Sequence, residues 1–141
     1  MFELADFYDF CQEEHVDVIP FDRCPQPGAT MRDQGFYAVF LNFNAIRSAR
    51  LLRGVCCHEM GHVATGALHK VDSPFELAER SEYRANRWVA EHYLTPALFR
   101  EAIAAGCKEF WQLAEFFDLP EADVRKAYTY WTERKGLDLR Q

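Results

Sequence analysis

Two histidines and a glutamate in the segment 58–62 have types and spacing suited to metal chemistry. The segment reads His58-Glu59-Met60-Gly61-His62 and lies in a stretch with a helical hydrophobic period. Residues four apart on a helix project from one face, one turn apart, so the imidazoles of His58 and His62 could bind one zinc ion. Glu59 lies about 100° around the helix from His58 and can approach a water molecule at the metal without being a ligand. The motif therefore favours a catalytic zinc site with Glu59 as general base over a pair of histidines that are merely satisfied on a helix face, but further ligands must support it.

A catalytic zinc site needs a third protein ligand and one coordination position that is open to water. Glu82 follows His62 by twenty residues on the next predicted helix. A loop of about five residues between two antiparallel helices would return its carboxylate to the histidines. Glu79, nearly one turn earlier on a similar face, is the alternative ligand. Asn86, one turn after Glu82, could accept the free ring N–H of a ligating histidine, or it could serve as a packing or capping amide.

Two helices must position these side chains. The first is predicted from Ser48 to about residue 68, because one stripe holds apolar residues and both histidines: Leu51, Val55, His58, His62 and Thr65. The second is predicted from the capping box Ser73-Pro74-Phe75-Glu76 to about residue 94. Gly61 on the first helix and Ala85 on the second are small, so the two helices could pack closely.

Further elements flank this helix pair. A short amphipathic helix is predicted over residues 2–14, and strands over Val16–Ile19 and Gly35–Asn42, with a proline-rich loop at 25–28 between the strands. Ala45-Ile46 could pair back on the second strand as a short hairpin arm. Thr95-Pro96 begins a helix that ends near Gly106, and apolar stripes predict two more helices, over 110–117 and 124–131. A small N-terminal sheet followed by helices makes the predicted fold class α+β.

The two metal-site segments together resemble the ImmA/IrrE family of zinc metallopeptidases. The resemblance rests on His58-Glu59-Met60-Gly61-His62-Val63, on Glu82-Tyr83-Arg84-Ala85-Asn86-Arg87-Trp88-Val89-Ala90 and on Tyr93-Leu94-Thr95-Pro96. The β-segment from Gly35 to Ile46 and the trailing helices from Leu113 through Val124 match as well. Two positions depart from the family pattern: Thr95 stands where a methionine is frequent, and Cys56-Cys57 directly precede the motif.

This resemblance implies a zincin-like α+β fold with zinc held by His58, His62 and Glu82, and with Glu59 as base. It implies a metalloendopeptidase in which Glu59 takes a proton from the attacking water and passes it to the leaving amine. Family members often cleave helix-turn-helix repressors of mobile elements or stress regulons, so a repressor is the implied protein substrate. Many members carry an additional DNA-binding or sensory domain, which this chain is too short to hold.

Length and composition set limits on the other classes of function. The chain has 141 residues, which predicts one domain over 1–141. Its net charge of −6 disfavours nonspecific binding to nucleic acid or to anionic lipid. No apolar run approaches the roughly 20 residues that span a bilayer, and the five cysteines have no framework spacing. We therefore expect a cytoplasmic protein without disulfides and without a membrane partner.

Several side chains have more than one interpretation. Cys56 and Cys57 are expected to be small buried residues, although an exposed thiol beside zinc would make the site sensitive to oxidation. His92 and Tyr93 are candidates to stabilise an oxyanion, with packing as the alternative. Tyr37 lies on a strand that would flank the cleft, where an exposed edge could pair with an extended substrate, with a tyrosine packed in the core as the alternative.

Two further functions are open at this point. The segment Leu113–Tyr128 fits a helix-turn-helix in outline, but residues 107–141 hold six Lys/Arg against seven Asp/Glu, which disfavours contact with DNA. The second is noncatalytic: a zincin-like module that binds a repressor or another partner, in an antirepressor or toxin-antitoxin role, with the metal supporting its structure.

Overall fold

The computed structural model describes residues 1–66 and 75–140. The elements run in the order α1 (Leu4–Glu13), β1 (Asp17–Pro20), β2 (Gly28–Asp33), β3 (Phe36–Leu41), α2 (Ala49–Thr65), α3 (Phe75–Tyr93), α4 (Pro96–Ala104), α5 (Phe110–Phe117) and α6 (Glu121–Thr129). A π-helical turn, Tyr130–Arg134, continues α6. The described part of the chain is thus an α+β fold with six α-helices and a three-stranded sheet, as the sequence predicts at the level of class.

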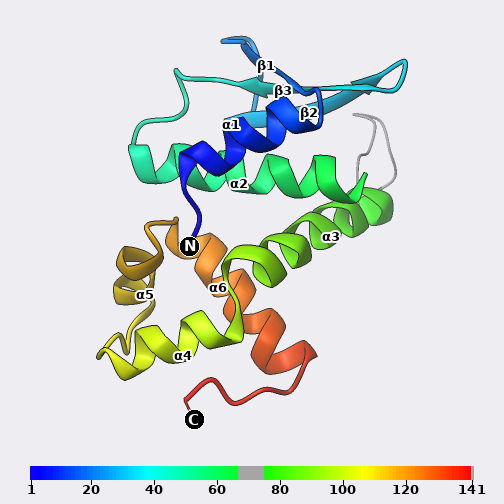
Figure 1. Cartoon of the computed structure of the whole chain (residues 1–141). Coiled ribbons are helices and arrows are strands. Elements are labelled where there is room, and N and C mark those ends of the chain that lie inside the picture. The colour runs from blue at the N-terminus through cyan, green and yellow to red at the C-terminus, as the bar shows by residue number, and fades with distance from the viewer. Residues whose placement is uncertain (67–74, 141) are drawn as a thin grey trace.

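Figure 1 shows how these elements are arranged. The sheet lies at one end, α2 runs beneath it, and α3 returns beneath α2 in the opposite sense. The helices α4, α5 and α6 gather at the other end. The core runs through the whole arrangement, from Phe7 of α1 and Leu41 of β3, through Met60 of α2, to Phe99 and Phe117 in the C-terminal helices. None of the helices in the described segments is long and apolar enough to span a bilayer.

The sheet has the order β1-β3-β2, with β1 parallel and β2 antiparallel to the central strand β3. A two-residue turn, Gln34-Gly35, joins β2 to β3, and both residues have positive φ, of 51° and 84°. This is the backbone that tight hairpins require, and glycine adopts it without strain. Only the strand β3 alternates clearly, with Val39 and Leu41 fully buried against the core.

The prediction for the partner of β3 is wrong. The segment Gly28–Asp33, whose first residue belongs to the predicted proline-rich loop, forms the strand β2. Its Gly, Ala, Met, Arg and Asp residues have little intrinsic preference for a strand, and pairing with β3 decides its conformation. The predicted arm at Ala45-Ile46 does not form, because both amides donate to the carbonyl of Asn42 and close a turn instead.

Helix ends follow the predicted local signals where the structure describes them. Ser48 caps α2 by accepting a hydrogen bond from the Leu51 amide at 3.0 Å, and Gly66, with a φ of 64°, ends that helix shortly before the predicted position. Thr95 caps α4 through the amide of Leu98. The predicted capping box at 73–76 extends outside the described residues, and α3 is described from Phe75 onward.

Candidate metal centre

Three side chains from α2 and α3 converge on one point. The Nε2 atom of His58 lies 2.7 Å from Oε2 of Glu82, and Nε2 of His62 lies 3.0 Å from the other oxygen, Oε1. The two Nε2 atoms are 3.1 Å apart. His62 is buried, whereas His58 and Glu82 are partly exposed, so one side of the cluster faces the protein and another is open. The structure therefore brings together the three residues that the sequence analysis selected as ligands.

The close packing of the two helices is what brings Glu82 to the histidines. A Cβ atom added at Gly61 would lie 2.7 Å from the carbonyl oxygen of Ala85, so the two backbones nearly touch at this point. Glu82 lies almost one turn before Ala85, on the same side of α3. Glu79, the alternative ligand, is exposed on the surface beside Arg80 and is outside the cluster.

The donor set fits a divalent metal ion. For bond lengths of 2.0–2.1 Å to zinc, the ligand atoms of a tetrahedral site are about 3.3 Å apart. The imidazoles lie 2.7 and 3.0 Å from the two Glu82 oxygens and 3.1 Å from each other, so each separation would have to widen by about 0.2–0.6 Å to reach that value. Hydrogen bonds from His58 and His62 hold the pKa of Glu82 well below its usual range, so its carboxylate is charged as a ligand must be.

Glu59 lies beside the cluster but is not part of it. Its side chain is 5% exposed, and its Oε1 atom accepts a hydrogen bond of 3.0 Å from the hydroxyl of Thr30 on β2. Burial raises the pKa of Glu59 above its usual range, although the nearby His58 and His62 and the bond from Thr30 lower it in part. A buried carboxylate with a raised pKa close to a metal site has the properties of a general base.

Thr30 is a site residue that sequence reasoning missed. It lies on the strand that the sequence analysis did not find, and a lone threonine carries no catalytic signature. The strand β2 runs against α2 so closely that a Cβ added at Gly28 would lie 3.4 Å from Cγ of Glu59. The two-residue Gln34-Gly35 turn ahead of an apolar strand is the one sequence signal that could have located β2.

The strand edge beside the site belongs to β2, which corrects the expectation for Tyr37. Tyr37 lies on β3, the central strand, with its ring under the Arg32 guanidinium at 5.7 Å. A Cβ added at Gly66 would lie 3.8 Å from the Tyr37 hydroxyl, so the Tyr37 ring lies near the end of α2. Within the described residues no strand pairs with the outer edge of β2, so this is the edge that could accept an extended peptide.

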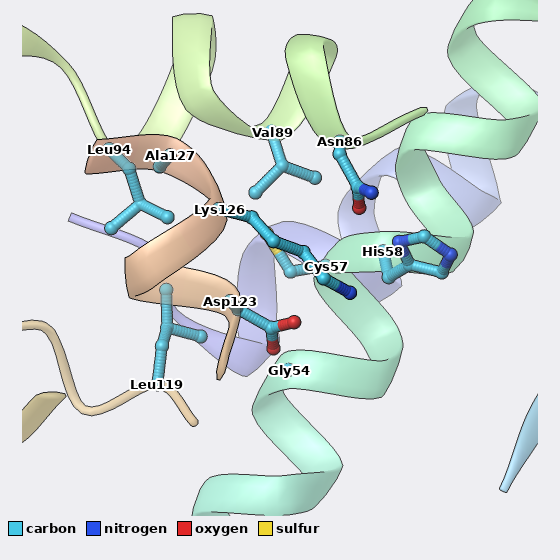
Figure 2. Close-up of a pocket in the computed structure, with 10 residues that line it drawn as sticks. All are labelled: Gly54, Cys57, His58, Asn86, Val89, Leu94, Leu119, Asp123, Lys126 and Ala127. Carbon is cyan, nitrogen blue, oxygen red and sulfur yellow. The ribbon is translucent and has the colours of Figure 1, made fainter. Parts of the chain in front are cut away.

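Behind the cluster, His58 also lines a small cavity between α2, α3 and α6. Figure 2 shows Asn86 on α3 with its amide directed toward the His58 ring. Asn86 thus lies near one of the two histidines, as its interpretation as a partner of a ligating histidine requires. The same view shows Asp123 and Lys126, both from α6, on the other side of this cavity. Neither α6 residue was selected from the sequence, where α6 is separated from the metal helices by more than 25 residues.

The two cysteines before the motif are buried, as expected. Cys56 and Cys57 belong to the hydrophobic core, and neither is among the three converging ligands. Burial raises the pKa of Cys56 to about 12 and that of Cys57 further still. Both are therefore protonated thiols without nucleophilic or redox character at neutral pH.

The oxyanion candidates lie away from the cluster. His92 stacks on Trp88 with ring centroids 4.2 Å apart, and its Nδ1 contacts the Trp88 carbonyl oxygen. Tyr93 packs its ring edge against Phe2, and burial raises its pKa to about 12. Ten residues along a helix correspond to about 15 Å, which separates His92 from Glu82. Packing is therefore the role that the structure supports for both.

The helix-turn-helix outline at 113–128 is formed by α5 and α6, but its second helix is packed on α2. A Cβ added at Gly54 of α2 would lie 2.6 Å from the Pro120 ring, directly before α6. Arg53 and Arg50 both form ion pairs with Asp118 in the turn between α5 and α6. The end of α6 that would enter a DNA groove in such a motif is thus in contact with α2.

Comparison with family models, with curated proteins and with solved structures found no match for this chain.

Proposed function

We propose that this protein is a zinc-dependent endopeptidase of the zincin type. The observation that carries the proposal is the convergence of His58, His62 and Glu82 beside the buried carboxylate of Glu59. Two imidazoles and one carboxylate form a donor set of catalytic zinc sites that keep a coordination position for water. The resemblance of the two metal-site segments to ImmA/IrrE metallopeptidases supports the same assignment and gives a helix-turn-helix repressor as the proposed substrate.

Each residue has a distinct task in this proposal. His58, His62 and Glu82 would hold the metal, whose chemistry when bound is to polarise the scissile carbonyl and to make the attacking water more acidic. Glu59 accepts the proton of that water and donates it to the leaving amine. Thr30 fixes the Glu59 carboxylate through its hydroxyl. The free edge of β2 would align an extended segment of the substrate next to the site.

The assignment is tested with the purified chain, its metal content, and cleavage of a purified helix-turn-helix repressor as the proposed substrate class. Glu59→Gln removes the base but no ligand, so it should retain stoichiometric zinc and bind the repressor without cleaving it. His62→Ala should lose both zinc and cleavage. Glu79→Gln is the matched control, because Glu79 is an exposed carboxylate of α3 outside the cluster.

The outcomes separate the alternatives. Retained cleavage by Glu59→Gln would refute the role of Glu59. Stable binding of the repressor by the wild-type chain without cleavage would favour the noncatalytic module. The same pair of imidazoles and one carboxylate also occurs in non-haem iron sites, so purification with stoichiometric iron in place of zinc would overturn the assignment of the metal.

A further inference from the structure

The polar groups behind His58 are the feature of the fold that the proposed function leaves without a role. The Nε2 atom of His58 faces Glu82 and His62, so its other ring nitrogen, Nδ1, is directed elsewhere. Figure 2 shows that nitrogen on the side of Asn86, facing the cavity that α6 closes. The cavity volume is about 10 Å³, close to the space one water molecule occupies. Groups on its wall can therefore interact directly or through a single water.

The position of Asp123 on this wall is fixed by close packing. A Cβ added at Gly54 would lie 2.7 Å from Oδ2 of Asp123, so the carboxylate rests directly on the backbone of α2. Gly54 precedes His58 by four residues, which is one turn on the same face of the helix. The Asp123 carboxylate therefore lies one turn from the imidazole, on the side of α2 that faces α6.

The charged groups of the cavity, Asp123 and Lys126, both come from α6. Lys126 lies three residues after Asp123 on α6, and Figure 2 shows its side chain extending between Asp123 and His58. Burial raises the pKa of Asp123, while Lys126 and His58 lower it in part. The wall thus offers two acceptors on the side of His58, the Asp123 carboxylate and the Asn86 amide oxygen, together with the Lys126 cation.

A histidine that binds a metal through Nε2 carries a proton on Nδ1, and an acceptor for that N–H fixes the tautomer and the ring orientation. We propose that Asp123 of α6 is a positioning residue for His58 and that the C-terminal helices thereby determine the affinity of the metal site. The inference rests on the metal site of the proposed function, but not on peptide hydrolysis. It makes α6 a functional part of the metal centre as well as a packing element.

The test compares zinc affinity by competition with a chromophoric chelator on the full chain. Asp123→Leu should lower the affinity by about 10–100-fold, the usual effect of losing such a partner of a ligating histidine. Asp123→Asn keeps the shape and one acceptor oxygen, so it should lose less. Glu121→Gln is the matched control, because Glu121 is an exposed acid of the same helix that pairs with Arg125. It should bind zinc as the wild-type chain does.

Two further measurements exclude a purely structural effect. The free energy of unfolding of the metal-free variants, from urea titration, should not account for the loss, and Asp123→Asn should fold as the wild type does. In the zinc-loaded wild type, the ring N–H proton of His58 should be protected from exchange and shifted downfield in the NMR spectrum. Both features should weaken in Asp123→Leu.

The results also separate this inference from the proposed function. Zinc affinity of Asp123→Leu within twofold of wild type would overturn the inference and leave the peptidase assignment standing. A wild-type chain that binds zinc tightly but cleaves nothing would overturn the assignment alone. A wild-type chain that binds no divalent metal would overturn both.

Discussion

The contact between Gly61 and Ala85 provides the sharpest test of how the fold builds the proposed metal site. In Gly61→Ala the new Cβ would lie 2.7 Å from the Ala85 carbonyl oxygen. A relaxed carbon–oxygen contact is about 3.4 Å, so the two backbones must separate by about 0.7 Å. Both atoms belong to helix backbones and no flexible side chain can move aside. The separation is therefore passed on to Glu82, which lies on α3 almost one turn away.

Two effects of this substitution differ in size. Overpacking costs about 1–3 kcal/mol of unfolding free energy, whereas replacing glycine by alanine in a helix returns about 1 kcal/mol. The net loss of stability should therefore be small, about 0–2 kcal/mol. Metal sites, by contrast, tolerate ligand displacements of about 0.2 Å, so a shift several times larger should lower zinc affinity at least about tenfold.

The assay measures both quantities on the same preparations. Urea titration of the metal-free protein gives the free energy of unfolding, and chelator competition gives the zinc affinity. Val63→Ala is the control, since Val63 is a core residue of the same helix, and removing two buried methyl groups should cost about 1.6 kcal/mol. The control should lose stability and keep zinc. Wild-type zinc affinity in Gly61→Ala would refute the argument that helix separation controls the site.

Two other predictions follow from the surroundings of the site. Thr30→Val removes the hydroxyl that donates to Glu59 and keeps the side-chain shape. It should lower kcat for cleavage about tenfold in steady-state assays, with zinc content unchanged. An unchanged kcat would show that Thr30 has no part in holding the base. Cys56 and Cys57 should resist alkylation in the folded protein at pH 8, because burial raises the pKa of Cys56 to about 12 and that of Cys57 further. The partly exposed Cys107 should react first. Mass spectrometry of the labelled peptides would show the order of reaction.

The ligand cluster could be predicted from sequence because its signals are local. The spacing of His58 and His62 is a property of one helix, and Glu82 needs only a second helix that returns along the first. The caps at Ser48 and Thr95 are likewise decided within a few residues, and both form as expected. Short-range geometry of this kind depends little on the rest of the fold.

The surrounding groups could not be predicted because long-range pairing decides them. Thr30 reaches Glu59 only because β2 adds to β3 and then runs along α2, and the residues of β2 do not favour a strand by themselves. Asp123 reaches the neighbourhood of His58 only because Gly54 lets α6 approach α2. In both cases a glycine lets two elements approach: Gly28 of β2 lies against Glu59, and Gly54 of α2 lies against Asp123. Neither glycine indicates this contact in the sequence.

The two carboxylates of the site differ in environment in a way that supports the roles proposed for them. Glu82 receives hydrogen bonds from both histidines, which favour its charged form and lower its pKa. Glu59 is enclosed between α2 and β2, and the cost of burying its charge raises its pKa. A ligand must stay ionised, whereas a base must take up a proton during the reaction and release it again. Exchanging the roles would require Glu82 to be protonated between two imidazoles that favour its charged form, and Glu59 to bind metal with a carboxylate that is buried and bonded to Thr30.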